Sequence, residues 1–433
     1  MAEILENPSS YQKLQALPKP KDLLLEASSV SFLVLKIASR CNINCTYCYM
    51  YNLGDNSYLS QPKVMSDQVV DRVLENSASH AQKYELSSFG FGFHGGEPIL
   101  AGHDFFTKFV EKANAKFAIL GITPFYYMQT NGMLMTKKLA RLFNELNINV
   151  GISLDGTQES NDRYRVDHKG KGTYTRIIAG IQNMEENRDP VSGKINLGIL
   201  NVIDIDSDPN ELYEHYKERL NTLSFDLLLP LANFDKLPPK PVAGPFANSE
   251  TPYADWLLAL FIAWFHDSSK NKPFIRIFDT IIRQILGGKA SMDSLGNNDK
   301  GLLVIETDGG IEPVDVLKMC GDGFTKQNLN ILSDSFEDAF KKPLVATYIQ
   351  NEKHLCEKCK ICPILEMCGG GYLPHRYSSL NNFDNPSVYC RDLIKLIAGI
   401  QSLVIRELPE ELKTRFSLRE LSYEKITNQL YGN

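Results

Sequence analysis

Three cysteines lie within eight residues in the first part of the chain. Cys41, Cys45 and Cys48 follow an apolar run at residues 32–37. Structural zinc sites and 4Fe–4S clusters usually take four protein ligands. A set of three leaves one coordination position for a substrate or cofactor, as catalytic metal sites do. The spacing therefore predicts a reactive metal centre, and the alternative is a group of buried or zinc-binding cysteines without chemistry.

The C-x3-C-x2-C spacing, with Tyr47 before the last cysteine, resembles the signature of the radical S-adenosylmethionine (SAM) superfamily. The resemblance implies that Cys41, Cys45 and Cys48 hold a 4Fe–4S cluster whose open iron binds SAM and reduces it to a 5′-deoxyadenosyl radical. It also implies an electron donor such as flavodoxin or ferredoxin. Tyr47 would lie against the adenine, although an aromatic ring beside a cluster can equally shield it.

A second motif, His-Gly-Gly-Glu-Pro at residues 94–98, follows the second predicted strand. Gly95 and Gly96 let the backbone approach a ligand closely, and the Glu97 carboxylate can accept a hydrogen bond from an ammonium group. In radical SAM proteins the Gly-Gly-Glu-Pro motif holds the amino group of SAM, and this sequence matches it letter for letter. The alternative is a glycine-rich turn with a solvated glutamate. We expect His94 to pack locally rather than to react.

Two polar segments end the third and fourth predicted strands, Gln-Thr-Asn-Gly at residues 129–132 and Ser-Leu-Asp-Gly at residues 153–156. Short polar side chains at this rim suit ribose hydroxyls and a carboxylate. The segments resemble the anaerobic sulfatase-maturase-like branch of the superfamily, which implies that Ser153 and Arg165 contact SAM. The alternative is that they are turn and capping residues. The other candidate SAM contacts are Thr130, Asn131, Asp155 and Val202.

Six further cysteines lie in the last third of the chain, at a spacing that suits either zinc or iron–sulfur clusters. They are Cys320, Cys356, Cys359, Cys362, Cys368 and Cys390. Their pattern resembles the SPASM domain of peptide-modifying radical SAM enzymes. The resemblance implies that one auxiliary 4Fe–4S cluster is held by Cys359, Cys362, Cys368 and Cys390. A structural zinc ribbon is the alternative.

The sequence departs from the SPASM pattern at two places. Tyr372 stands where the pattern has a cysteine, and Glu-Pro-Val-Asp at residues 312–315 stands where a Gly-Pro-Cys turn is usual. Only Cys320 and Cys356 remain for a second auxiliary cluster. That cluster would need ligands from elsewhere or would be missing, so the pattern leaves one or two auxiliary clusters open.

Two regions narrow the resemblance further, residues 227–239 and residues 369–390, together with the cysteine segment. They resemble the maturases that build cyclophane-containing peptides. Those enzymes join an aromatic ring carbon to the β-carbon of a residue two places downstream in a ribosomally made precursor peptide. The likeness runs over nearly all of residues 30–392. The resemblance implies that the substrate is a precursor peptide with a leader and a core. It also implies that the N-terminal segment, the connector or the SPASM surface binds the leader.

Crosslinking also needs a base, which the pattern does not identify. The candidates are Asp235, Asp315, Glu312 and His375. Other peptide modifications on the same scaffold are alternatives: thioether crosslinking, epimerisation and formylglycine formation. A non-catalytic iron–sulfur or zinc protein that binds peptides is an alternative from another class, but such a protein has no use for an open iron.

Hydrophobic periodicity predicts how these motifs are positioned. Strands are expected at residues 32–38, 88–93, 124–129, 149–154, 194–202 and 224–230. Helices are expected at residues 64–78, with Ser66 as N-cap, and at 103–117, 136–146, 174–186 and 209–220. Six βα units with motifs at the strand ends predict an α/β fold with a partial (β/α)6 barrel, parallel strands and right-handed crossovers.

The remaining segments predict four other regions around the barrel at residues 30–235. Residues 1–29 are an N-terminal extension, and residues 236–301 are a proline-rich connector with helices at 253–266 and 275–285 and a loop at 288–301. A small cysteine-rich, SPASM-like iron–sulfur domain is expected at residues 302–395. C-terminal helices are expected at residues 396–433.

The composition argues against several classes of protein. A chain of 433 residues with 43% hydrophobic and 23% charged residues is typical of globular proteins. The net charge of −6 and the lack of a basic stripe argue against a nucleic-acid partner. No apolar run approaches the length of a membrane span or a signal peptide. Nine cysteines without a secretory signal favour metal ligands in a reducing compartment, so we expect a cytoplasmic protein.

Overall fold

The computed structural model describes residues 29–187, 197–220, 224–242, 244–290, 292–296, 301–415 and 418–432. The predicted N-terminal extension, except for its last residue, lies outside the described residues. The first three residues of the strand predicted at 194–202, and parts of the loop predicted at 288–301, also lie outside them.

One nine-stranded sheet organises the described part of the chain, in the order β7-β6-β5-β4-β3-β2-β1-β8-β9. Every neighbouring pair from β7 to β8 is parallel, and β9 pairs antiparallel with β8. The strands are β1 (Phe32–Ala38), β2 (Ser88–Gly95), β3 (Thr123–Thr130), β4 (Ile148–Ser153), β5 (Leu197–Val202), β6 (Ser224–Leu228), β7 (Phe274–Ile275), β8 (Leu302–Ile305) and β9 (Ile311–Glu312).

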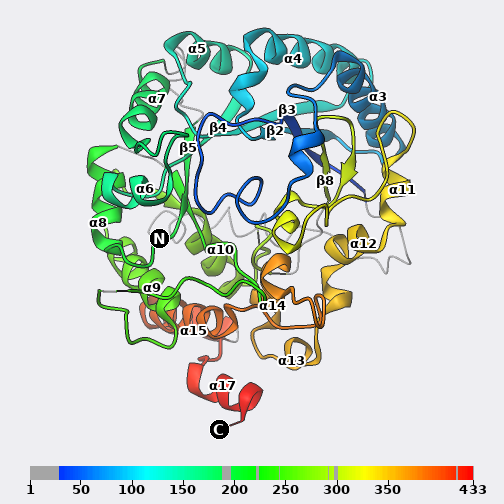
Figure 1. The fold of residues 1–433 in the computed structure, drawn as a ribbon. Coiled ribbons are helices and arrows are strands. Elements are labelled where there is room, and N and C mark those ends of the chain that lie inside the picture. Colours follow the sequence, from blue (N-terminus) through cyan, green and yellow to red (C-terminus); the bar gives the residue numbers. More distant parts are fainter. Residues whose placement is uncertain are drawn as a thin grey trace.

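The helices that connect the first six strands form an outer layer around the sheet (Figure 1). They are α3 (Asp67–Lys83), α4 (His103–Ala118), α5 (Lys137–Glu145), α6 (Gln158–Tyr164), α7 (Tyr174–Glu186) and α8 (Pro209–Glu214). Ser66 caps α3 as predicted, because its side chain accepts a hydrogen bond from the Val69 N–H. The strand order and the parallel pairing confirm the predicted α/β barrel fold.

Aromatic packing fixes β2 between the barrel interior and the outer helices. Phe89, Phe91 and Phe93 are fully buried. The ring of Phe93 lies edge-on to Phe109 of α4, with ring centroids 5.0 Å apart. On the opposite face the strand needs glycine, because a Cβ at Gly90 would lie 2.2 Å from the ring of Phe32. The alternating Phe-Gly sequence therefore places the strand, and the motif that follows it, close to β1.

The helix predicted at residues 209–220 is interrupted. The α-helix α8 ends at Glu214, and residues His215–Arg219 form a π-helical turn. This wider turn carries Tyr216 inward, where its hydroxyl donates to the Leu154 carbonyl at 2.6 Å and accepts from the Gly156 N–H at 2.8 Å. The interruption thus holds the Ser-Leu-Asp-Gly turn at the end of β4.

The cysteine-rich region is joined to the same sheet rather than standing apart from it. Its first strand, β8, pairs in parallel with β1, and Val34 lies opposite Val304. Helical periodicity could not give this pairing, and the domain division at residue 302 stays a prediction. Short helices follow: α11 (Phe336–Phe340), α12 (Pro343–Ile349), α13 (Glu357–Lys360) and α14 (Leu365–Cys368), with 3-10 turns at Asp315–Cys320, Asn351–His354 and Leu373–Arg376.

Longer helices close the side of the molecule between the two ends of the sheet (Figure 1). They are α9 (Pro252–Phe265), α10 (Arg276–Ile285) and α15 (Cys390–Glu407), and α15 packs against both α9 and α10. The helices α16 (Glu410–Arg415) and α17 (Tyr423–Tyr431) end the described chain. Two more 3-10 turns, Ser57–Ser60 and Pro98–Ala101, flank the motifs of β1 and β2.

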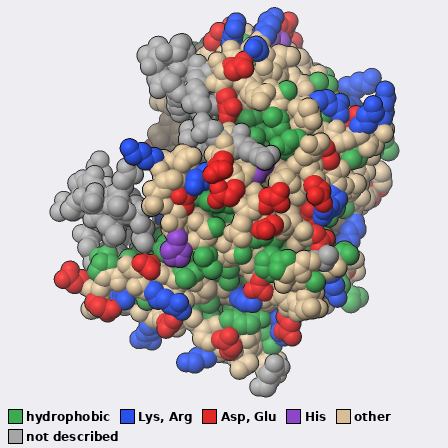
Figure 2. Space-filling view, turned by 90° about the vertical axis from the view of Figure 1, so that its left-hand side faces the viewer, with side chains coloured by type: hydrophobic (Ala, Val, Ile, Leu, Met, Phe, Trp, Pro, Cys, Tyr) green, Lys and Arg blue, Asp and Glu red, His purple; other side chains and the backbone are tan. Residues whose placement is uncertain are grey.

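The surface seen in Figure 2 mixes side chains of all kinds. Acidic, basic and hydrophobic side chains are interspersed on this face rather than gathered into one charged field. Among the described residues, no helix combines the length and the apolar character that a membrane crossing requires.

Candidate functional site

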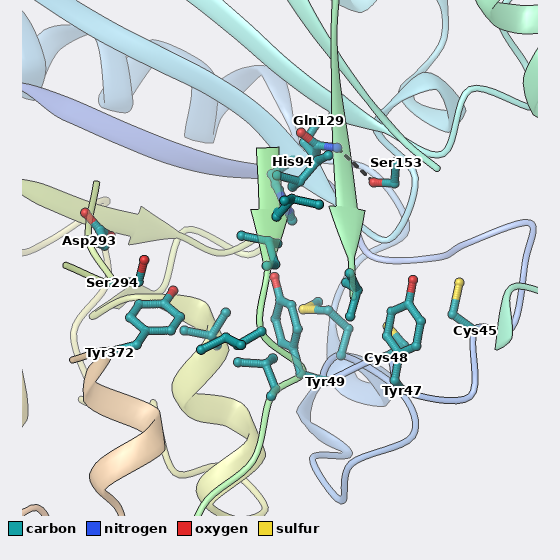
Figure 3. Close-up of a pocket in the computed structure, with 18 of the residues that line it drawn as sticks. Cys45, Tyr47, Cys48, Tyr49, His94, Gln129, Ser153, Asp293, Ser294 and Tyr372 are labelled. Atoms are coloured by element: carbon teal, nitrogen blue, oxygen red, sulfur yellow. Dashed lines mark hydrogen bonds between the residues drawn. The ribbon is translucent and has the colours of Figure 1, made fainter. Parts of the chain in front are cut away.

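The carboxyl ends of the strands surround a cavity of about 530 Å³. Cysteines 41, 45 and 48 line it, as do most of the predicted SAM contacts: Tyr47, Gly95, Gly96, Thr130, Asn131, Ser153, Arg165 and Val202. In Figure 3, Cys45, Tyr47 and Cys48 lie on one side of the cavity, Tyr372, Asp293 and Ser294 lie on the other, and Tyr49 stands between them. The structure therefore brings together motifs that are far apart in the sequence.

The cysteine loop is held in place from the side of α6. The N–H groups of Asn44 and Thr46 donate to the carbonyl oxygens of Val166 and Tyr164, at 2.7 and 2.9 Å. Burial raises the pKa of Cys41 to about 12 and that of Cys48 to about 11. Thiols of this kind are poor nucleophiles and ionise when a metal centre binds them, so ligation by the loop stays a prediction that this burial fits.

The two glycines of the Gly-Gly-Glu-Pro motif let this turn pack directly on the start of the cysteine loop. A Cβ at Gly96 would lie 2.0 Å from the Tyr51 hydroxyl, and a Cβ at Gly95, whose φ is +138°, would lie 2.1 Å from the Ala38 carbonyl oxygen. The Glu97 N–H donates to the Arg40 carbonyl at 2.9 Å. Larger residues here would push the cysteine loop away from the cavity.

Glu97 itself does not line the cavity, because its carboxylate is fully buried and bound by protein donors. It accepts from the Ile99 N–H at 3.0 Å, the Thr130 hydroxyl at 2.7 Å and the Asn131 N–H at 2.9 Å. Burial raises its pKa, and these three bonds oppose that shift. Glu97 therefore positions the Thr130–Asn131 backbone, and its direct contact with SAM stays a prediction.

Arg165 reaches the cavity from the segment after α6. Its Nη1 donates to the Tyr47 hydroxyl at 2.9 Å, and Tyr47 in turn donates to Asp155. The other Asp155 oxygen accepts from the Val202 N–H at 2.9 Å. Asp155 therefore holds the Tyr47 hydroxyl in place without lining the cavity itself. The Arg165 Nε is buried and has no hydrogen-bond partner among the residues that the structure describes. A guanidinium with an unused donor at the cavity wall suits a carboxylate ligand.

Ser153, another predicted SAM contact, also lines the cavity and accepts a hydrogen bond from the Gln129 side chain at 2.8 Å (Figure 3).

Of the four candidate bases, Asp315 does not itself line the cavity, but it lies in a buried polar group with Tyr49 and His94, which do. Its Oδ2 accepts from the Tyr49 hydroxyl at 2.5 Å and from the Lys36 ammonium. Burial, the largest single influence, would raise the pKa of Asp315, but the charges of Lys36 and His94 and the hydrogen bonds from Lys36 and Tyr49 together outweigh it, and the pKa lies below its usual range. Lys36 also donates to Nδ1 of His94 at 2.9 Å, and burial, with Lys36, lowers the His94 pKa to about 4. His94 also lines the cavity, and its expected local packing role stays a prediction.

Glu312 lies elsewhere, in a buried ionic cluster around Lys318. Its carboxylate accepts from the Lys318 ammonium at 3.1 Å and from the Thr325 hydroxyl at 2.6 Å. Glu306 lies 3.2 Å from the same ammonium, and burial, with the charge of Glu312, raises its pKa to about 7. Asp55, also fully buried, adds a third carboxylate 3.8 Å away. This cluster joins the segment after the cysteine loop to β8 and β9, and Glu312 does not line the cavity.

The two remaining candidates are placed differently from each other. Asp235 is exposed and accepts from the backbone N–H of Ser379 at 3.0 Å, which ties the connector to the cysteine-rich region outside the cavity. His375 lines the cavity, but burial lowers its pKa to about 3, and its ring packs edge-on against Tyr372 and Tyr389. Among the four candidates, Asp315 is the carboxylate hydrogen-bonded to a residue of the cavity wall.

Four of the later cysteines line a second, smaller cavity between α13, α14 and α15. They are Cys359, Cys362, Cys368 and Cys390, the set that the sequence pattern predicts for one auxiliary cluster. Cys356 does not line that cavity; its thiol is hydrogen-bonded to Cys359. Cys320 packs against a different small core that contains Leu317 and Tyr377. The two remaining cysteines are therefore not brought together.

Sequence reasoning overlooked Tyr49 and Lys36. Tyr49 follows the last cysteine of the loop directly, and Lys36 is the one charged residue in the apolar strand β1. A buried lysine inside a strand needs a counter-charge, so its isolation was a signal that an acid lies beside it. Nothing in the spacing could identify that acid as Asp315, 279 positions away.

Residues 35–212 match the family model of the radical SAM superfamily. This part of the chain is therefore similar to radical SAM domains. The match runs from β1 into α8 and includes the cysteine loop and the Gly-Gly-Glu-Pro motif.

Curated proteins that resemble this chain cover most of its length. A cysteine-type anaerobic sulfatase-maturating enzyme of Clostridium novyi (strain NT) is 27% identical over 367 residues, covering 84% of this chain and 92% of the relative. A serine-type anaerobic sulfatase-maturating enzyme of Bacteroides thetaiotaomicron is 25% identical over 366 residues, covering 81% and 84%.

Solved structures agree on the fold. Native anSMEcpe with bound AdoMet gives a TM-score of 0.73 at 24% identity, covering 87% of this chain and 99% of that chain. Streptococcus suis SuiB bound to precursor peptide SuiA gives a TM-score of 0.52 at 14% identity, covering 89% and 88%. At these identities the likeness shows a shared fold.

A radical SAM domain implies SAM and a 4Fe–4S cluster, and the residues of the larger cavity fit both groups. Three thiols, a buried guanidinium with an open donor and the Asn131 side chain meet at one end of it. The four cysteines of the smaller cavity fit an auxiliary 4Fe–4S cluster. A second auxiliary cluster does not fit, because Cys320 and Cys356 lie apart and Tyr372 lines the larger cavity.

Proposed function

We propose that this protein is a radical SAM enzyme that oxidises a side chain of a peptide and crosslinks an aromatic ring to a neighbouring β-carbon. The observation that carries the proposal is the shared cavity. One end holds the three cysteines and the predicted SAM contacts, and Tyr49 connects that end to the buried carboxylate of Asp315. A hydrogen atom and a proton can therefore leave the same substrate at neighbouring positions.

The cofactor site is supplied by residues already described. SAM bound to a 4Fe–4S cluster supplies a 5′-deoxyadenosyl radical, which removes hydrogen atoms from unactivated carbon. Cys41, Cys45 and Cys48 would hold the cluster, and Arg165 would bind the SAM carboxylate. Asn131 lies between them, because its Nδ2 is 3.7 Å from the Cys41 sulfur.

The rest of the cavity suits a largely apolar substrate. Leu228, Leu229 and Leu231, which end β6 and begin the connector, line it together with Ile277 of α10. An apolar wall excludes water from a carbon radical and holds the two reacting carbons in one orientation. Tyr372, which replaces a cysteine of the SPASM pattern, adds an aromatic surface on the side away from the three cysteines (Figure 3).

Asp315 is the proposed base. Rearomatisation after ring attack releases one proton and one electron from the substrate. The Tyr49 hydroxyl is positioned to pass that proton to Asp315, with which it already shares a hydrogen bond. The Lys36 ammonium keeps Asp315 ionised and ready to accept it. The electron has a destination in the proposed cluster on Cys359, Cys362, Cys368 and Cys390.

Formylglycine formation on a cysteine or serine is the second candidate, and the curated relatives favour it. Both curated relatives named above are sulfatase-maturating enzymes. That oxidation also needs hydrogen-atom removal, one proton acceptor and one electron acceptor, so the same residues would serve it. We propose a ribosomally made peptide as the partner in either case, with flavodoxin or ferredoxin as the electron donor.

The experiment compares products. The anaerobically reconstituted enzyme is incubated with synthetic peptides that carry an aromatic residue two places before an aliphatic one, and with peptides that carry a cysteine or serine in place of the aromatic residue. Crosslinking gives a peptide lighter by two hydrogens that does not react with a hydrazide and resists fragmentation between the joined residues. Formylglycine formation gives a hydrazide-reactive aldehyde. An aldehyde product from the cysteine or serine peptides, with no change in the aromatic ones, would overturn the crosslinking proposal in favour of the second candidate.

A further inference from the structure

Arg376 is a buried cation without an anionic partner. It is fully buried, and its guanidinium donates only to neutral groups. These are the carbonyl oxygens of Asn385 at 3.2 Å, Phe383 at 2.8 Å and His354, and the Asn351 side-chain oxygen at 2.6 Å. In the part of the chain that the structure describes, no carboxylate forms an ion pair with it. A buried charge of this kind is costly unless an anion lies nearby.

The cysteine cavity is the place where that anion would lie. Burial lowers the pKa of the Arg376 guanidinium, and the sulfurs of Cys359 and Cys356, followed by the exposed Asp384, oppose that shift. Gly370 lines the same cavity, and a Cβ built on it would lie 3.7 Å from Nη1 of Arg376. Asn351, which accepts from Arg376, also donates to the Gly369 carbonyl at 2.9 Å. The guanidinium is thus anchored directly behind the cavity wall.

We propose that Arg376 is the built-in counter-charge of the auxiliary cluster and raises its reduction potential. The inference rests on the proposed ligation of that cluster by Cys359, Cys362, Cys368 and Cys390. One-electron reduction adds one negative charge to a cluster that four thiolates already make anionic. A fixed cation in a low-dielectric wall favours the more negative, reduced state. Arg376 is therefore a positioning and tuning residue that makes the cluster a better electron acceptor.

Lys358 supplies a matched control. It also lines the cysteine cavity, but it is only partly buried, and its ammonium lies over the Tyr431 ring, 3.9 Å from the ring centroid. Water can reach and screen this charge, so its effect on the cluster is smaller. Arg376 and Lys358 thus offer one buried and one solvated cation beside the same four cysteines.

The test measures the reduction potential of the auxiliary cluster alone. The full-length protein with Cys41, Cys45 and Cys48 replaced by alanine is reconstituted with iron and sulfide, and the EPR signal of the reduced cluster is followed during a dithionite titration with redox mediators. Arg376→Gln should shift the ratio of reduced to oxidised cluster at a fixed potential by at least about tenfold toward the oxidised form, which is about 59 mV for one electron. Arg376→Lys, which keeps the charge, should shift it much less, and so should Lys358→Gln.

Because Arg376 also holds three backbone carbonyls, Arg376→Gln could lose iron for structural reasons. Asn351→Asp is a second variant, which keeps the arginine and places a carboxylate on the guanidinium; because it removes the Asn351 hydrogen bond to the Gly369 carbonyl, its iron content is measured first. It should lower the potential in the same direction as Arg376→Gln. An unchanged potential in either iron-loaded variant overturns the role of Arg376. If the parent protein, with Cys41, Cys45 and Cys48 replaced by alanine, binds no iron at the later cysteines, the auxiliary cluster does not exist and this proposal fails with it. SAM cleavage by the wild-type protein is a separate measurement, and it tests the proposed function independently.

Discussion

The Tyr49 hydroxyl donates to Oδ2 of Asp315 at 2.5 Å, and so joins two residues that lie 266 positions apart. Tyr49 belongs to the cysteine loop at the end of β1, whereas Asp315 begins the 3-10 turn after β9. The contact exists because β8 pairs with β1 and carries β9 to the cavity wall. The predicted cluster loop and the proposed proton acceptor thereby follow β1 and β9, two strands of one sheet that β8 separates.

Replacing Asp315 by asparagine should uncouple SAM cleavage from product formation. The amide cannot accept the proton, so product formation should fall by about 100- to 10,000-fold, while 5′-deoxyadenosine is still released. Tyr49→Phe should show a smaller loss in the same direction. The measurement is the ratio of modified peptide to 5′-deoxyadenosine by mass spectrometry. Glu312→Gln, a carboxylate of the Lys318 cluster, is the matched control and should keep the wild-type ratio; a normal ratio in Asp315→Asn would remove Asp315 as the base.

Replacing Arg165 by glutamine should weaken SAM binding by about ten- to a hundredfold, because a charge-assisted bond to a carboxylate is lost. The iron content should not change. Arg163→Gln is the control: Arg163 pairs with Asp204 at 2.9 Å and does not line the cavity, so its loss should change the SAM dissociation constant by less than about threefold. Equal effects of the two substitutions, measured by equilibrium dialysis under anaerobic conditions, would contradict the assignment of Arg165.

Iron analysis should find about eight irons per chain, four at each cysteine cavity. Cys368→Ala should leave about four, release some 5′-deoxyadenosine and give little modified peptide. Cys320→Ala should keep about eight, because Cys320 packs in a separate small core. About twelve irons in the wild-type protein would show that a second auxiliary cluster exists, against the arrangement of Cys320 and Cys356 described above.

Glu306 should make the protein less stable as the pH rises toward neutrality. Its pKa is raised from 4.5 to about 7, chiefly by burial, so the folded state holds a proton that the unfolded state has already released. Between pH 5 and pH 7 this group lowers the free energy of unfolding by up to about 1.4 kcal/mol per pH unit. Glu306→Gln should remove that slope. The difference between the two proteins in urea unfolding at several pH values isolates Glu306 from other titrating groups, and parallel pH profiles would contradict the assignment.

The fold was largely readable from the sequence because its signals are local. The apolar run of β1, the Ser66 cap of α3 and the helix α7 depend on neighbouring residues, and each was predicted within a few positions. The pairing of β8 with β1 and the π-helical turn at His215–Arg219 were not predictable, since both depend on contacts between distant segments. Spacing shows that an element exists but not where its partner lies.

The candidate site, like the fold, could be predicted only where its signals are local. The cysteine loop could be predicted as a ligand set because its three members share one short segment. Glu97 could be singled out as a functional residue, but not its bonds to Thr130 and Asn131, which depend on how β2 and β3 end together. Asp315 was one of four equal candidates, and only the three-dimensional contact with Tyr49 separates it from Glu312 and Asp235.

The most direct test of the account is SAM cleavage by the reconstituted protein. With iron, sulfide and dithionite under anaerobic conditions, the wild-type chain should convert SAM to 5′-deoxyadenosine and methionine. The variant with Cys41, Cys45 and Cys48 replaced by alanine should release none, while keeping the iron of the smaller cysteine cavity. Continued release of 5′-deoxyadenosine by that variant, or none from an iron-loaded wild-type protein, would contradict the assignment of the cavity as a radical SAM site.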